Sequence, residues 1–193
     1  MELLGTSEQR RVDALHRYEI LDSLPEVEFD RLTRIVAHLL DAPLVLINFI
    51  DTDRAWFKSS QGTELRQLSR GMAICAFTIK EDRILMISDL QNLSDAERSR
   101  YPATGDTQVR SYIGVPLTTP DGYRIGTLCA HDVRPRTFTE AEQNLLIDLG
   151  PVVIDALELR LAVLQARRAE VANAYLANHD ALTGLPNRRR LAE

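Results

Sequence analysis

The sequence has too few cysteines, too short an apolar run and too little excess charge for several classes of protein. Two cysteines among 193 residues cannot form a disulfide framework, and a reducing compartment is the simpler interpretation. The longest apolar run, "APLVLINFI", is far too short to cross a bilayer, and the N-terminus "MELLGTSEQRR" lacks the pattern of a signal peptide. A net charge of −5 argues against nucleic acid or an anionic membrane as the main partner. We therefore expect a cytoplasmic protein without a membrane segment.

Hydrophobic residues make up 45% of the chain, which is enough for one packed core. Apolar residues at helical spacing and apolar runs of strand length alternate along the first part of the sequence. The predicted elements are helices over 7–21, capped by Ser7, and over 26–40, and strands within 42–62, 83–90, 109–117 and 123–133, the last two joined as a hairpin. This order predicts an α/β (α+β) fold.

A long helix is predicted to follow the last strand. Thr139 and Glu142 have the spacing of a capping box at its start, and Pro151 predicts a kink or a division into two helices. Further along, apolar residues recur every four and three residues, as in a coiled coil. That stripe consists of Leu157, Leu161, Leu164, Val171 and Tyr175, with Arg168 interrupting it. The stripe favours a pair of parallel helices from two chains over a single helix lying on its own domain.

Four segments carry a resemblance to a known family. They are "ILDSLPEVEFDRLTRI", "INFIDTDRAWFKSSQG", "RGMAICAFTI" and "IGVPLTTPDGYRIGTLCAHDVRPRTFTEAE". In this order they resemble a GAF domain of the bacterial subgroup that precedes signalling output domains, over roughly Glu8 to Glu158. The resemblance implies an antiparallel sheet with helices on one face and a loop-covered pocket on the other, followed by a long signalling helix.

The closing stretch, "HDALTGLPNRRRLAE", resembles the opening of a GGDEF domain, the catalytic unit of diguanylate cyclases. The residues that match the opening motif are Asp180, Leu182, Thr183, Gly184, Leu185, Asn187 and Arg188. The implied organisation is a GAF sensor domain over 1–157, a coiled-coil linker over 158–178 and the first residues of a truncated GGDEF domain over 179–193. A complete parent would use GTP and Mg²⁺ to make cyclic di-GMP. This chain lacks the catalytic core, so we expect no activity, catalytic residue or cofactor in it.

Several residues are candidates for binding a ligand in the GAF pocket. They are Asn48, Trp56, Cys75, Phe77, Asp89, Arg110, Tyr112, Cys129 and His131. Asn48 interrupts an apolar strand, so its amide needs a partner, which a structural hydrogen bond or a ligand could provide. Arg110 and Tyr112 share one strand face and, with Asp89, are the candidate polar groups.

The cysteines have a structural and a chemical interpretation. Cys75 lies among apolar neighbours, which favours a buried inert thiol over a reactive one. Cys129 and His131 lie two residues apart on a strand and so point to one face. With Cys75 they would make an incomplete metal site, but no fourth ligand is evident, and we expect no metal.

The sequence therefore predicts a regulatory GAF module that controls a C-terminal diguanylate cyclase through a dimeric signalling helix. The homodimer would form through the apolar stripe, and an unknown small molecule could bind the pocket. One alternative is a ligand-free dimerisation scaffold. Another is a thiol-based redox sensor or enzyme that uses Cys75. None of these involves nucleic acid or a membrane.

Overall fold

The computed structural model describes residues 2–94, 97, 101 and 109–178, with side chains from residue 7 onward. The helices are α1 (Glu2–Arg17), α2 (Val27–Leu40), α3 (Cys75–Thr78) and α5 (Glu140–Asn178), with a short 3₁₀ helix, η1 (Arg70–Met72). The strands are β1 (Leu44–Ile50), β2 (Arg54–Gln61), β3 (Gln67–Ser69), β4 (Leu85–Ile87), β5 (Ser111–Thr118) and β6 (Arg124–Asp132).

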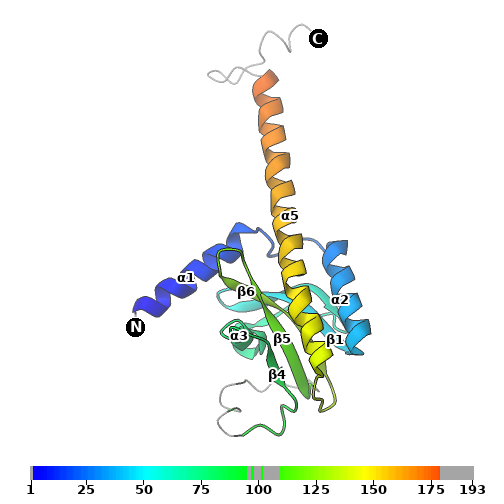
Figure 1. Cartoon of the computed structure of the whole chain (residues 1–193). Coiled ribbons are helices and arrows are strands. Elements are labelled where there is room, and N and C mark those ends of the chain that lie inside the picture. The colour runs from blue at the N-terminus through cyan, green and yellow to red at the C-terminus, as the bar shows by residue number, and fades with distance from the viewer. Residues whose placement is uncertain (1, 95–96, 98–100, 102–108, 179–193) are drawn as a thin grey trace. The chain divides into compact units, whose positions relative to one another are not determined.

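Within these described residues, six strands form one antiparallel sheet in the order β3-β2-β1-β6-β5-β4 (Figure 1). The polar turn between Ile50 and Arg54 joins β1 to β2, and β5 and β6 form the predicted hairpin. Gly122 in that hairpin has φ of 87°, a conformation that glycine adopts without strain. The fold class expected from the sequence is confirmed.

The two faces of the sheet are covered by different elements. On the face that we call helix-covered lie α2 and the first part of α5 (Figure 1). Their buried side chains include Phe29, Val36, Leu146 and Val153. On the opposite face, which we call loop-covered, α3 contacts β1, β5 and β6 and is preceded by η1. Ligand access is therefore expected on the loop-covered face, where the short helix α3 and the segment before it lie over the strands.

The long helix α5 begins with the predicted capping box. The hydroxyl of Thr139 accepts a hydrogen bond from the backbone N–H of Glu142, while the carboxylate of Glu142 accepts one from the Thr139 N–H at 2.7 Å. Pro151 lies inside one continuous helix, so the expected division into two helices is wrong. Leu146 and Val153 on either side of Pro151 are both buried, and this shared packing holds the helix together against the lost hydrogen bond.

Contacts between Cα atoms divide the chain into two compact units, Met1–Leu157 and Glu158–Glu193. In the second unit, the described part of α5 presents a shallow apolar hollow lined by Leu164, Arg168, Val171, Tyr175 and Leu176, among others. The residues of the GGDEF-like opening motif, Asp180, Leu182, Thr183, Gly184, Leu185, Asn187 and Arg188, lie outside the described residues.

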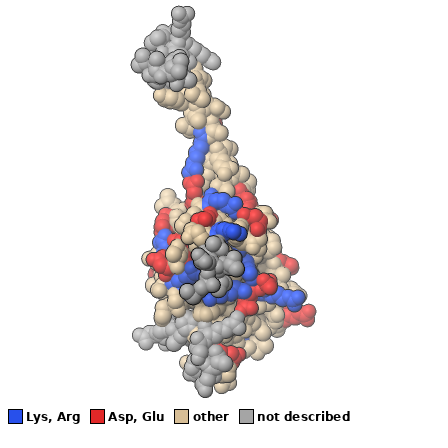
Figure 2. All heavy atoms as spheres, turned by 90° about the vertical axis from the view of Figure 1, so that its left-hand side faces the viewer, with Lys and Arg blue, Asp and Glu red and all other residues tan. Residues whose placement is uncertain are grey.

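Charged side chains of both signs are interspersed over the side of the molecule shown in Figure 2. One pair, Arg17 and Asp121, is solvent-exposed with 2.6 Å between its nitrogen and oxygen. A deeper group centres on Asp132 at the end of β6, whose buried carboxylate contacts Arg134 and Arg136. In the described part of the chain, no helix is long and apolar enough to span a membrane.

Candidate sensory pocket

A cavity of about 200 Å³ opens on the loop-covered face of the sheet. Most of its walls are apolar side chains from β1, β2, β3 and the η1–α3 segment. The lining residues are Leu44, Leu46, Phe57, Gly62, Thr63, Leu65, Leu68, Met72, Ala73, Ile74, Cys75, Val109 and His131. An apolar cavity with a few polar groups is the usual form of a small-molecule site.

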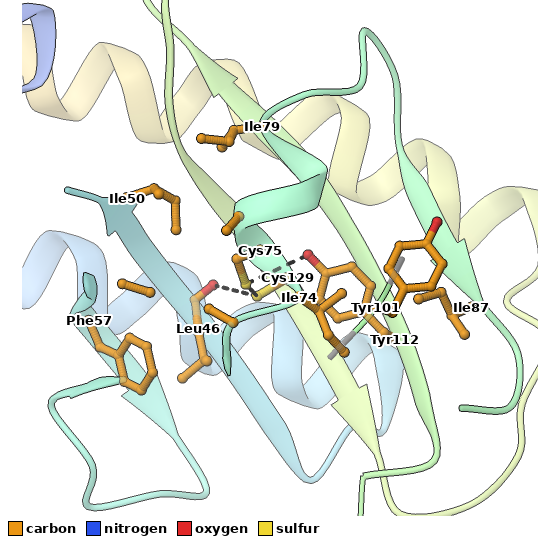
Figure 3. Packing of buried hydrophobic residues seen from close by; sticks show 13 residues of the cluster. Leu46, Ile50, Phe57, Ile74, Cys75, Ile79, Ile87, Tyr101, Tyr112 and Cys129 are labelled. Atoms are coloured by element: carbon orange, nitrogen blue, oxygen red, sulfur yellow. Dashed lines mark hydrogen bonds between the residues drawn. The ribbon is translucent and has the colours of Figure 1, made fainter. Parts of the chain in front are cut away.

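Two of the lining residues belong to a group of three that we call the thiol–imidazole cluster: Cys75, Cys129 and His131. The Sγ atoms of Cys75 and Cys129 are 3.5 Å apart, and Nε2 of His131 lies 3.6 Å from Sγ of Cys129. The three ligand atoms all lie within 4.8 Å of one another, and the three residues are buried. Figure 3 shows the two sulfur atoms side by side beneath α3.

Strand geometry explains half of this arrangement. Thr127, Cys129 and His131 alternate along β6 and so share the loop-covered face. Cys75 comes from α3, which lies over that face, and is brought to Cys129 only by the tertiary fold. The sequence predicted the shared face of Cys129 and His131 and raised a grouping with Cys75 as a possibility, which no local spacing could establish.

Polar side chains surround the cluster. Nδ2 of Asn48 lies 3.2 Å from Sγ of Cys75 and donates to Oγ1 of Thr127 at 2.9 Å. The Tyr112 hydroxyl lies 2.6 Å from Oγ1 of Thr78 and 3.7 Å from Sγ of Cys75 (Figure 3). The amide nitrogen of Asn48 thus has three acceptors, of which two are sulfur atoms.

The space for the Tyr112 side chain exists because residue 114 is glycine. A Cβ atom on Gly114 would lie 2.3 Å from the Tyr112 hydroxyl and 3.0 Å from Cβ of Cys129. Neither distance is compatible with a normal contact, so a larger residue would displace the tyrosine. Gly114 is therefore part of the geometry of the cluster.

Two buried polar atoms next to the pocket have no hydrogen-bond partner in the described part of the chain: Oδ1 of Asn48 and Nδ1 of His131. Burying such an atom without a partner costs about 1–3 kcal/mol. Most buried polar groups in folded proteins do have partners. Of these two residues, His131 lines the cavity, so the cavity wall contains unused hydrogen-bonding capacity.

The pKa values of the two thiols in the cluster are shifted in opposite directions. The hydrogen bond with Cys129 lowers the pKa of the Cys75 thiol well below its usual value, against the effect of burial, and His131 lowers it further. Burial and the neighbouring Cys75 raise the pKa of the Cys129 thiol. Burial likewise raises the pKa of Tyr112. Of the two thiols, Cys75 is therefore the one whose pKa is lowered.

The other candidates from the sequence lie elsewhere. Asp89 and Arg110 form a two-pronged ion pair, with distances of 2.7 and 2.8 Å, and hydrogen bonds from Arg110 lower the pKa of Asp89. Asp89 lines a separate polar pocket together with Ser88, Asn92 and other residues. Arg110 is occupied by this pair, and neither Arg110 nor Tyr112 is among the residues that line the apolar cavity.

Trp56 and Phe77 do not line the apolar cavity. Phe57 does, and because neighbouring strand residues point to opposite faces, Trp56 points to the helix-covered face. Phe77 packs edge-to-face against Tyr101, with ring centres 5.6 Å apart. Thr78 and Thr127 are the polar residues that the sequence reasoning missed. Thr127 could have been found, because it precedes Cys129 by two residues on the same strand.

Comparison with known proteins identifies the family. The family model for the GAF domain matches residues 25–154, and the chain belongs to this family. A solved GAF domain, from an Acinetobacter phosphoenolpyruvate-protein phosphotransferase, superposes with a TM-score of 0.58 at 18% identity. That superposition covers 81% of this chain and 98% of the other, and it shows the shared fold.

Two curated relatives are proteins of cyclic di-GMP metabolism. A cyclic di-GMP phosphodiesterase of Pseudomonas aeruginosa is 29% identical over 97% of this chain and 29% of its own length. The diguanylate cyclase DgcP of Escherichia coli is 32% identical over 44% of this chain and 25% of its own length. The chain therefore spans between a quarter and a third of the length of these relatives.

Proposed function

We propose that this chain is the sensory and regulatory part of a longer cyclic di-GMP signalling protein, and that it controls a C-terminal diguanylate cyclase. The observation that carries the proposal is the similarity of nearly the whole chain to one part of a cyclic di-GMP enzyme. The resemblance of residues 179–193 to a GGDEF opening supports the cyclase as the output. GTP and Mg²⁺ would be bound by that output domain and not by this chain.

The sensory role follows from the apolar pocket on the loop-covered face. Its walls suit a small, largely apolar molecule, and the unpartnered Nδ1 of His131, a lining residue, would give that molecule a polar contact. A ligand that binds one conformation better than another shifts the population toward it. The pocket is therefore the proposed input.

The output would pass through a helix pair. Val171 and Tyr175 are 71% and 52% exposed, and with Leu161 and Leu164 they form the stripe proposed to pair with a second copy. Leu157 is fully buried in the Met1–Leu157 unit, so we assign the seam to the four residues that follow it. The charged Arg168 within this stripe would weaken the helix pair, so that the two helices could change their register or crossing angle.

The test replaces Arg168 and compares dimerisation with turnover in the full-length protein. Arg168→Leu should tighten the dimer at least tenfold, about 1.4 kcal/mol, and make cyclase turnover insensitive to pocket ligands. Asn173→Leu is the matched control, because it adds the same side chain to an exposed position outside the stripe. Equal dimerisation and equal turnover in the two variants would contradict the coiled-coil mechanism.

A phosphodiesterase output is the second candidate, and the Pseudomonas aeruginosa relative favours it. The same preparations distinguish the two outputs, because a cyclase consumes GTP and a phosphodiesterase consumes cyclic di-GMP. A ligand-free scaffold would show neither a pocket ligand in native mass spectrometry nor a metabolite that raises the Tm.

A further inference from the structure

We propose that Cys75, Cys129 and His131 bind one thiophilic metal ion of the zinc(II) type, with a fourth coordination position open to the apolar pocket. This proposal deepens the sensory role above and rests on the same pocket. It goes against the expectation from sequence, which found no fourth ligand for these three residues.

The spacing of the three ligand atoms fits a tetrahedral ion. A zinc ion with normal bond lengths holds two thiolate sulfurs about 3.8 Å apart and a sulfur and an imidazole nitrogen about 3.6 Å apart. The observed distances are 3.5 Å between the sulfurs and 3.6 Å from Sγ of Cys129 to Nε2 of His131. Small side-chain movements would bring all three atoms, already within 4.8 Å of one another, onto one ion.

The surroundings suit a metal thiolate. Asn48 directs its amide N–H group toward both sulfurs, at 3.2 and 3.5 Å, and the Tyr112 hydroxyl donates to Cys75. Such donors orient ligands and stabilise the negative charge on sulfur. Two thiolates in an apolar interior would repel each other, and a divalent cation removes that cost.

The pocket supplies the open position. Cys75 and His131 both line the cavity of about 200 Å³, so an ion between them would face it. A water molecule occupies only about 30 Å³, which leaves room for a larger metal-binding molecule. Three protein ligands with one exchangeable position are the arrangement of reactive rather than structural zinc sites. The ligand class implied is a small molecule with a metal-binding atom and an apolar body.

A disulfide between the two cysteines is the competing interpretation, because their sulfurs are near enough for small movements to join them. It would leave His131 without a role and would give the Asn48 donors a poor acceptor. Oxidation and metal binding also exclude each other at these sulfurs. The test therefore uses the chain under a thiol-free reductant, with oxidised chain as a parallel sample.

The experiment titrates the purified chain with zinc(II) against a chromophoric chelator, and with cobalt(II) as a spectroscopic probe. We expect one equivalent per chain, thiolate-to-cobalt charge transfer and the intense visible bands of a four-coordinate site. Cys75→Ser, Cys129→Ser and His131→Gln should each weaken binding at least about tenfold. His38→Gln, on the exposed side of α2, is the matched control and should bind as the parent does.

Circular dichroism and urea unfolding of each variant separate lost ligands from lost fold. The proposal is overturned if the folded, reduced chain takes up no stoichiometric metal, or if the three variants bind as tightly as His38→Gln. It is also overturned if cobalt(II) binds without charge transfer from sulfur. Metal binding is measured without any output domain, so it can fail while ligand-dependent regulation of turnover stands, and the reverse outcome is equally visible.

Discussion

On the helix-covered face of the sheet, the buried ammonium group of Lys58 has three acceptors within 2.8 Å: Ser23, the Leu24 carbonyl and Glu26. On the loop-covered face, buried Asn48 and His131 each retain an atom without a partner in the described structure. The first face thus gives a buried ammonium group three acceptors, and the second leaves two buried polar atoms without a hydrogen-bond partner. The difference separates polar groups whose hydrogen bonds hold the fold together from those that we propose to lie at the sensory site.

A β-bulge makes the first arrangement possible. The register of β1 against β2 shifts between Ile47 and Asn48, so that Ile47 pairs with Ser59 and Asn48 with Phe57. The extra residue, Lys58, lies over the Phe29 ring of α2, and Ser59 bonds to Asp30 in the same helix. Two consecutive residues therefore reach the helix-covered face, while Phe57 stays in the pocket wall.

The largest expected effect is on the satisfied face. Lys58→Met should destabilise the chain by about 3 kcal/mol, because it leaves Glu26 and two further acceptors without their buried cation. Urea unfolding followed by circular dichroism measures the loss. Lys80→Met, which removes an exposed lysine above the Phe77 ring, is the control and should change little. If Lys58→Met lowered the free energy of unfolding by less than about 1 kcal/mol, the buried polar groups of the helix-covered face would not stabilise the fold more than those of the loop-covered face.

Acid should weaken the ion pairs around Asp132 next. Burial raises the pKa of Asp132, but hydrogen bonds from Arg134 and Arg136 outweigh it, so the pKa is below the usual value. The carboxylate therefore stabilises the fold above the unfolded pKa of about 3.9, and this contribution is lost as pH falls through the lower folded value. Asp132→Asn should cost about 2 kcal/mol at neutral pH.

Urea unfolding at a series of pH values tests this expectation. The difference between Asp132→Asn and the parent should shrink as the pH approaches the folded pKa of Asp132. Asp121→Asn, in the exposed pair with Arg17, should leave the curve nearly unchanged. A difference that persists undiminished in acid would show that the carboxylate charge is not what stabilises this corner.

Thr33 and Asn48 offer a matched comparison of the two faces, because both are fully buried polar residues. Thr33 on α2 bonds to Ser59 at 2.8 Å and to the Asp30 carbonyl at 3.2 Å. Thr33→Val should therefore cost about 1 kcal/mol in thermal or urea unfolding. Thr52→Val at an exposed turn is the control, and an equal loss there would make the buried bonds irrelevant.

The smallest effect on stability is expected for Asn48→Leu, about 0.5 kcal/mol or less. The substitution removes an unpartnered oxygen, weak bonds to sulfur and one bond to the Thr127 hydroxyl, and an apolar group of similar shape replaces them. The loss of the Thr127 bond and the relief of the unpartnered oxygen act in opposite directions, which keeps the net change small. Zinc affinity should nevertheless fall by about tenfold or more, since the amide donors to both thiolates are lost. If zinc affinity were unchanged and stability fell strongly, Asn48 would be a residue that stabilises the fold, as Lys58 is, and would not support the metal site.

Much of the fold could be predicted because its signals are local. The hairpin of β5 and β6 and the capping box at Thr139 depend on residues close in sequence. The start of α1 at Glu2 was missed, because Ser7 is a typical cap while Gly5 and Thr6 are weak helix formers. The strand β3 was missed because three residues are too few to show alternation.

The candidate site could be predicted only in part. Period-two spacing places Cys129 and His131 on one face, but nothing local brings Cys75 to them. The burial of Lys58 runs against the usual exposure of lysine and depends on the bulge. Ion pairing removed Arg110 from the pocket, and strand alternation placed Trp56 on the other face. Except for Trp56, contacts between residues distant in sequence decided these outcomes.

The requirement for glycine at position 114 could help to recognise the same cluster in other GAF domains. The φ of Gly114 is ordinary and its neighbours are a normal strand, so in a sequence it looks replaceable by alanine. A single added methyl group would nevertheless collide with the Tyr112 hydroxyl and with Cys129. The combination of a glycine two residues after a tyrosine with two cysteines and a histidine can be recognised in a sequence. Scanning GAF sequences for it would collect the domains built to hold the same cluster, and would set apart those that keep the fold without it.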